Sequence, residues 1–282
     1  HQKGFFMNEK ELAIKTAFIE IIDRIFENAE AYKYFLISVL LKELKSRNGR
    51  YHSFERTIEI NNLTRKPIEQ CLTGLYCLAC HIEEINNELF DDSKGVYPIY
   101  QELMEAAISS GFFSLDELIE LAGTGCINDI VENCGEFSTW NIEQSEIPLY
   151  VVVKNSYSIK GKLYRSGYQW NSSQKAWIKS FSTQEEAENE KIALWELDSE
   201  IVVSIQTRLE MLFDFDYYVV VKPQLELNQT FQVHGYRYEE YGVKKHYVKR
   251  VPTKYFFHER DFLLRLEVPF KLITPKIIHE TN

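Results

Sequence analysis

Cysteine and histidine come close together at one point of the chain, in the segment CLACH at Cys77–His81. This Cys-x-x-Cys-His order is the attachment signature of c-type haem. Haem attachment takes place outside the cytosol, and the sequence has no export signal. The segment also falls in a helical pattern whose apolar face would hold Cys77, and cysteine is a common small core residue. We therefore predict that Cys77 is buried in a core and that no cofactor is bound.

A zinc site and a thiol nucleophile are the other chemistries that cysteines could support. Four cysteines are zinc ligands by type: Cys77, Cys80, Cys126 and Cys134. The second pair has seven residues between its members, where two to four are usual. A thiol nucleophile would need a histidine brought from elsewhere in the chain. Its candidates by chemistry are Cys126 or Cys134 with His52, His81 or His234. We predict no metal and no catalytic residue, and an enzyme with an unrecognised site stays an alternative.

Basic residues gather in the C-terminal half, although the whole chain has a formal net charge of −10. Between Tyr150 and Phe181 there are six Lys and Arg residues and no acid. Cations beside aromatic rings are typical of nucleic-acid binding. The predicted contacts are Lys160, Lys162, Arg165, Lys175, Lys179, Arg237, Lys244, Lys245, Lys249 and Arg250. The candidates for base stacking are Tyr168, Tyr236 and Tyr238.

These cations and rings also have structural interpretations. We expect the cations of residues 150–181 to lie largely on one exposed side, and those of residues 237–250 likewise, unless they pair with acids of the N-terminal half. The rings could pack across strands, as any small sheet requires. For Trp170 and Trp177 we favour core packing, with the two residues on paired strands of a hairpin.

The C-terminal half contains an internal repeat. The sequence YVVVK at Tyr150–Lys154 returns at Tyr218–Lys222, and the same shift of 68 carries Gly167-Tyr168 to Gly235-Tyr236. After two added residues, the shift becomes 70 and Trp177 corresponds to Tyr247. A fixed self-similarity of this kind indicates two copies of one module. Each copy reads as a strand, a short connection, two aromatic strands and a helix.

The first copy resembles a known family through Lys160, Leu163, Gly167-Tyr168, Trp170, Lys175-Ala176-Trp177 and Trp195. It is similar to the accessory segment that follows the exonuclease domain in some bacterial 3′→5′ exonucleases related to the polymerase III proofreading subunit. The resemblance covers about 45 residues and the weaker second copy, and it does not cover an exonuclease. It implies a module that accompanies nucleic-acid enzymes and has no catalytic role of its own.

The N-terminal half is acidic and mainly helical by pattern. Residues 1–149 carry 13 basic and 25 acidic residues. Ile14, Phe18, Ile21 and Ile25 have the spacing of a buried helix face. Further helices are predicted for Ala31–Arg47, after Thr64, from Gln101, and from a capping box at Ser114 and Glu117.

Residues 31–105 resemble a winged helix-turn-helix in the order of their elements. After a short element at Ser53–Asn62 and the helix that carries Ile68, Leu72 and Leu75, we expect two paired strands at His81–Ile85 and Val96–Tyr100. A plain helical bundle with a hairpin is the alternative. Few residues here suit DNA reading, so docking or dimerisation is the more natural role.

The sequence therefore predicts an α+β protein. Residues 7–148 form an acidic, mainly helical domain with a winged helix at 31–105. Residues 149–213 form the first β-rich module, with a long linking helix at about Gln184–Phe213, and residues 214–282 form the second. If the six residues before Met7 are a cloning remnant, the natural chain begins there.

For function, we expect a non-catalytic protein whose basic modules contact nucleic acid and whose acidic domain contacts protein partners. The rival is a protein-interaction adaptor, inhibitor or bacterial effector. The sequence contains no membrane-spanning run and no signal peptide, and the cysteine usage is that of a reduced compartment, which together predict a cytoplasmic protein without a membrane partner. Self-association is left open.

Overall fold

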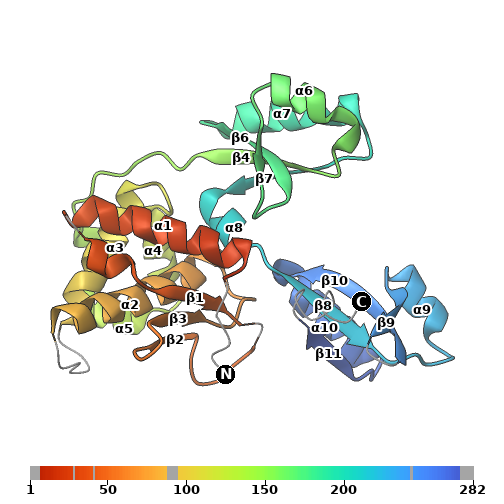
Figure 1. Ribbon diagram of the computed structural model, residues 1–282, viewed down its shortest axis with the longest axis horizontal. Helices are drawn as coiled ribbons and strands as arrows, with labels where there is room; N and C mark the ends of the chain where they lie inside the picture. The colour runs from red at the N-terminus through yellow and green to blue at the C-terminus, as the bar shows by residue number, and fades with distance from the viewer. Residues whose placement is uncertain (1–6, 28, 41, 88–94, 242–243, 274–282) are drawn as a thin grey trace. The chain divides into compact units, whose positions relative to one another are not determined.

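The computed structural model describes residues 7–27, 29–40, 42–87, 95–241 and 244–273 (Figure 1). The chain forms two compact units. The first comprises residues up to 39, 49–60 and 67–212, and the second comprises 40–48, 61–66 and 213 onward. No helix in the described residues is both long enough and apolar enough to cross a membrane.

The chain begins with helix α1 (Glu9–Ile25), as predicted, with Ile14, Phe18 and Ile21 buried. A capping box between Asn8 and Glu11 starts this helix. After the short η1 (Glu30–Lys33), a three-stranded sheet follows, consisting of β1 (Leu36–Val39), β2 (Gly49–His52) and β3 (Thr57–Ile60). The strand order is β1-β3-β2, with β1 parallel and β2 antiparallel to β3.

The predicted helix at Ala31–Arg47 is wrong, because β1 occupies its centre. The segment Phe35–Val39 alternates in burial, and its backbone pairs with β3 far along the chain. Long-range pairing of this kind overrides a local helical pattern.

The winged-helix prediction is also wrong. Helix α2 (Pro67–Asn86) continues through the expected first strand, and helix α3 (Val96–Ser109) covers the expected second strand. The predicted turn between them lies mostly outside the described residues. Ile68, Leu72 and Leu75 are buried as expected, and Leu78 and Ile82 extend the same buried face by two further turns. A single long apolar stripe therefore explains the segment better than a helix followed by a strand.

Helix α4 (Leu115–Gly123) begins at the predicted capping box of Ser114 and Glu117. Helix α5 (Asn128–Cys134) and the short η2 (Phe137–Thr139) complete this part of the chain.

The predicted linking helix at Gln184–Phe213 is wrong in its second half. Helix α7 (Gln184–Leu197) is followed by strand β7 (Val202–Thr207) and the short helix α8 (Arg208–Leu212). The β-branched residues of β7 suit a strand, and β7 completes the first four-stranded sheet.

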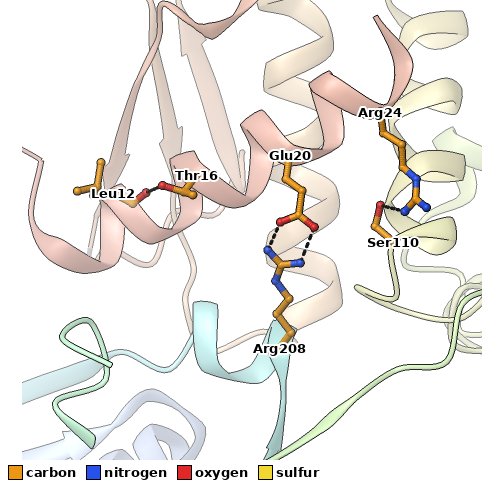
Figure 2. A network of polar contacts seen from close by, with 6 residues as sticks. All are labelled: Leu12, Thr16, Glu20, Arg24, Ser110 and Arg208. Carbon is orange, nitrogen blue, oxygen red and sulfur yellow. Dashed lines mark hydrogen bonds and ion pairs between the residues drawn. The ribbon is translucent and has the colours of Figure 1, made fainter. Parts of the chain in front are cut away.

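Helix α8 forms hydrogen bonds with α1 and with the first module. The Arg208 guanidinium donates two hydrogen bonds to the Glu20 carboxylate, one of them 2.9 Å long, as Figure 2 shows. The same guanidinium lies 4.2 Å from the centre of the Phe112 ring. Lys10 Nζ and Gln174 Nε2 both donate to the carbonyl oxygen of Met211.

The first module is a four-stranded antiparallel sheet with two helices on one face (Figure 1). Its elements are β4 (Leu149–Lys154), η3 (Tyr157–Ile159), α6 (Lys160–Arg165), β5 (Gln169–Asn171), β6 (Ala176–Phe181), α7 and β7. The strand order is β5-β6-β4-β7. The core between sheet and helices includes Val151, Val153, Leu163 and Leu194.

The second module repeats this order of strands and α-helices, and differs in the place of its short 3₁₀ helix. It consists of β8 (Asp216–Val221), α9 (Asn228–Val233), β9 (Arg237–Tyr241), β10 (Lys244–Pro252), η4 (Thr253–Tyr255), α10 (Phe256–Arg265) and β11 (Phe270–Ile273). The strand order is β9-β10-β8-β11, which is the order of the first sheet element for element. The repeat predicted this agreement, except for the final strands β7 and β11.

The repeated Gly-Tyr pair has a specific structural role in both modules. Gly167 and Gly235 each have a φ of 84°, in the left-handed region that favours glycine. Tyr168 N–H donates to the Leu163 carbonyl, and Tyr236 N–H donates to the Phe231 carbonyl. Together with the N–H bonds of the two glycines, this is the Schellman motif that ends a helix. The motif turns the chain from α6 into β5 and from α9 into β9.

Candidate nucleic-acid interface

Three of the predicted cations are paired with carboxylates of their own module. Lys179 lies 3.6 Å from Glu190 of α7, and Lys249 lies 2.5 Å from Glu259 of α10. Arg250 pairs with Asp216 of β8. In these three ion pairs the carboxylate belongs to the same module as the cation, and not to the N-terminal half.

Lys179 and Lys249 belong to a cluster of three residues that both modules contain. In the first module the Tyr168 hydroxyl donates to the Glu190 carboxylate over 3.0 Å, and Lys179 approaches the same oxygen. In the second module the Tyr236 hydroxyl donates to Glu259 over 2.5 Å, and Lys249 binds the other oxygen. Each lysine also lies above its tyrosine ring. We name these clusters the Tyr–Lys–Glu triads. They join the sheet to its helix, and each lysine is paired with a carboxylate of its own module.

Tyr168 and Tyr236 are therefore wrong as stacking residues. Their side chains are only 2% and 3% exposed, and burial raises the pKa of both hydroxyls. Each tyrosine is the last residue of its Schellman motif, and its ring packs in the core of its module. Of the three stacking candidates, only Tyr238 is exposed.

The strongest group of free cations lies on α6. Leu163 faces the core, whereas Lys160, Lys162 and Arg165 are exposed. Two rings that the sequence analysis did not select, Tyr157 and Tyr164, are 83% and 73% exposed beside them. Lys160 Nζ lies 4.3 Å from the centre of the Tyr157 ring. We name these five exposed residues, from Tyr157 to Arg165, the α6 surface.

The β5–β6 hairpin, which follows α6 in the chain, has further exposed residues. Trp170 on the edge strand β5 is 56% exposed, so the prediction that it belongs to the core is wrong. Its cross-strand partner Trp177 is half-buried and packs on the core, with the two ring centres 5.8 Å apart. Lys175, in the turn between the strands, is exposed. Within the described residues, Lys160, Lys162, Arg165 and Lys175 form no ion pair.

Acidic residues of the first module lie on its other helix. Residues 182–200 contain seven acids and one lysine, and Glu185, Glu186 and Glu196 of α7 are exposed. An anionic ligand is attracted by the α6 surface and repelled by α7. The charge of the module therefore favours one side of it for phosphate contacts.

The second module has few of these features. The positions of Lys160, Lys162 and Arg165 correspond to Asn228, Thr230 and Val233 at the shift of 68. Val220 and Val248 form a separate cluster on the face of the sheet opposite Lys249. Arg237 pairs with Val248, and Arg250 lies two residues after Val248, so both arginines point to that opposite face. The expectation of one shared exposed side is thus wrong here. Lys245 is exposed and lies 5.9 Å from the centre of the Tyr238 ring, whereas the side chain of Lys244 is outside the described part.

In the described residues, no group of three or more His, Cys, Asp or Glu side chains is placed to hold a metal ion. Cys77 is buried in α2, as predicted, and Cys80 and His81 are buried beside it. Burial raises the pKa of the Cys134 thiol to about 11, which disfavours the thiolate. His52 is bonded to Glu59, and His234 stacks on Phe262.

The chain matches no protein-family model, no curated protein and no solved structure. The likeness to exonuclease accessory segments stays a prediction.

Proposed function

We propose that the chain associates with nucleic acid through the α6 surface and the β5–β6 hairpin of its first module. The observation that carries this proposal is the set of four exposed cations without ion pairs, interleaved with three exposed rings. A surface that serves only solubility usually mixes both signs of charge and exposes few large apolar side chains close together. Cations neutralise phosphates and rings stack on bases, so this combination suits a nucleic acid.

The Tyr–Lys–Glu triads reduce the number of predicted cations that can contact phosphates. Because Lys179 and Lys249 each bind a glutamate of their own module, they support the fold. Lys160, Lys162, Arg165 and Lys175 remain for phosphate contacts in the first module, and their cationic groups reach solvent.

A charge-reversal variant tests the proposal. We expect K160E/K162E/R165E to abolish most binding of labelled 20-nucleotide strands at low salt, as measured by fluorescence anisotropy. Each phosphate contact contributes about 0.7 to the slope of log affinity against log salt for a single strand. Removing three contacts should therefore flatten the slope by about 2.

The chain offers a matched control for this variant. Lys42, Lys45 and Arg47 are three exposed cations within six residues, and K42E/K45E/R47E changes the net charge by the same amount. We expect this control to keep most of the affinity and slope. Equal losses in both variants would mean that only overall charge matters, and the proposal would then be wrong.

A role as a protein-interaction adaptor is the second candidate, favoured by exposed apolar side chains on α7. Ile192 and Trp195 are 52% and 46% exposed, one turn apart on the acidic helix. Aromatic anchors of this kind are common at protein interfaces. If no nucleic acid binds at low salt, this proposal takes precedence.

A further inference from the structure

The two modules differ on their short helices but agree on their hairpins. Trp170 on β5 and Tyr238 on β9 occupy the same place in the repeat, and both are about half exposed, at 56% and 52%. Each pairs across its hairpin with the aromatic residue that packs on the core, Trp177 or Tyr247. The outer ring is thus held by an inner ring while part of it stays open to solvent.

An exposed lysine accompanies each outer ring. Lys175 and Lys245 correspond at the shift of 70, and both are exposed on the strand or turn that follows the ring. Lys245 Nζ lies 5.9 Å from the centre of the Tyr238 ring. A ring beside a cation matches the arrangement of a base beside its phosphate.

We infer that the ligand is a single-stranded nucleic acid, and that Trp170 and Tyr238 are stacking platforms for its bases. This inference rests on the proposed function and specifies its ligand. In a duplex, the faces of the bases are covered by their neighbours, so exposed rings have no base face to meet. In a single strand every base offers such a face.

The size of the basic element also disfavours duplex reading. A helix of six residues such as α6 is about 9 Å long. Major-groove readers insert a longer helix or a two-stranded ribbon into a groove about 12 Å wide. The β5–β6 hairpin is not a free ribbon of this kind, because β6 also pairs with β4. The α6 surface instead offers two rings, Tyr157 and Tyr164, on either side of its lysines. It suits a flexible strand whose bases can turn toward these rings.

The modules should contribute unequally. The first has the α6 surface in addition to its hairpin ring, whereas the second has Asn228, Thr230 and Val233 at the corresponding positions. Trp170 should therefore matter more for affinity than Tyr238.

The test uses the full chain with 12-nucleotide DNA and RNA strands and with duplexes of the same sequence. We expect the wild type to bind single strands at least about tenfold more tightly than duplexes. W170A should weaken single-strand binding by about fivefold to about a hundredfold, the range for loss of one stacked base. Y238A should have a smaller effect, and W170F should restore most of the affinity because it keeps a ring. Circular dichroism checks that each variant is folded, and Trp170 is exposed enough to be replaced without a cavity.

Different failures have different meanings. Equal binding of duplexes and single strands, or full affinity in W170A, would overturn the inference and leave the proposed function in place. Absence of binding to every strand and duplex would overturn both.

Discussion

Lowering the pH from about 6.5 to about 4 should destabilise the N-terminal helices by about 3 kcal/mol through His81 alone. The His81 ring is fully buried on α2 between the rings of Phe35 and Tyr51. Its Nδ1 lies 2.9 Å from the Tyr51 hydroxyl. Burial, aided by the positive charge of Arg56, lowers the pKa of His81 to about 4.

The sign of the effect follows from proton binding. Above pH 6.5 the imidazole is neutral in the folded and the unfolded chain, so it adds no pH dependence. Below pH 6.5 the unfolded chain takes up a proton that the folded chain rejects, and stability falls until the folded pKa of about 4 is reached. Glu84, which opposes the shift, is the acidic group that acts on this ring.

Urea unfolding followed by circular dichroism at pH 7, 5.5 and 4.5 measures this effect. The variant H81Q should lose most of the pH-dependent decrease, since glutamine does not titrate. Replacing the exposed His258 by glutamine is the matched control and should leave the decrease unchanged. A wild type and H81Q with the same pH profile would show that His81 is not held neutral by burial.

The variant E259Q should lower the free energy of unfolding of the second module by about 2 to 3 kcal/mol. Glu259 is 8% exposed and accepts bonds from Tyr236 and Lys249. A neutral amide leaves the ammonium group of Lys249 without a counter-charge in a largely buried place. This penalty exceeds the modest net value of an ordinary hydrogen bond.

The equivalent variant E190Q should cost only about 1 kcal/mol, because its triad is more exposed. The side chains of Lys179 and Glu190 are 31% and 26% exposed, against 23% and 9% for Lys249 and Glu259. Hydrogen exchange within α7 and α10 reports the two losses separately in one molecule. If both helices exchange equally fast in their respective variants, burial does not govern the strength of the triads.

The repeat in the sequence predicted the architecture of the C-terminal half well. A constant shift fixes which residues correspond. The corresponding residues Trp170 and Tyr238 have corresponding cross-strand partners in the structure, Trp177 and Tyr247. The final strands β7 and β11 were missed because they lie beyond the matched segments. Strand β7 follows a helical stripe, and its pairing with β4 adds to the strand preference of its β-branched residues.

In the N-terminal half, local patterns predicted the helices whose buried face is continuous, such as α1 and the start of α2. They failed where long-range pairing decides the structure, as in β1, and where one helix was long enough to resemble two elements. Isoleucine and leucine in the second half of α2 suit a strand as well as a helix, so the pattern alone could not choose.

The sequence predicted which segment holds the candidate site, but not which of its side chains face solvent. The acid-free segment identified the correct part of the chain, yet nothing in the sequence distinguished Lys179, which faces Glu190, from Lys175, which faces solvent. Strand alternation gives Lys175 and Lys179 the same face, because they are four residues apart, so it could not separate them. Lys179 pairs with the core residue Val151, which places it on the helix-covered face. The exposure of Tyr157 and Tyr164 depends on how α6 packs, and only the structure reveals that.

Hydrogen–deuterium exchange of the full chain, with and without a saturating 20-nucleotide single strand at low salt, tests the central claim most directly. The proposed binding surface predicts slower exchange across residues 157–176, which include α6 and the β5–β6 hairpin, and unchanged exchange in α7. Unchanged exchange at 157–176, or protection confined to the N-terminal helices, would contradict it.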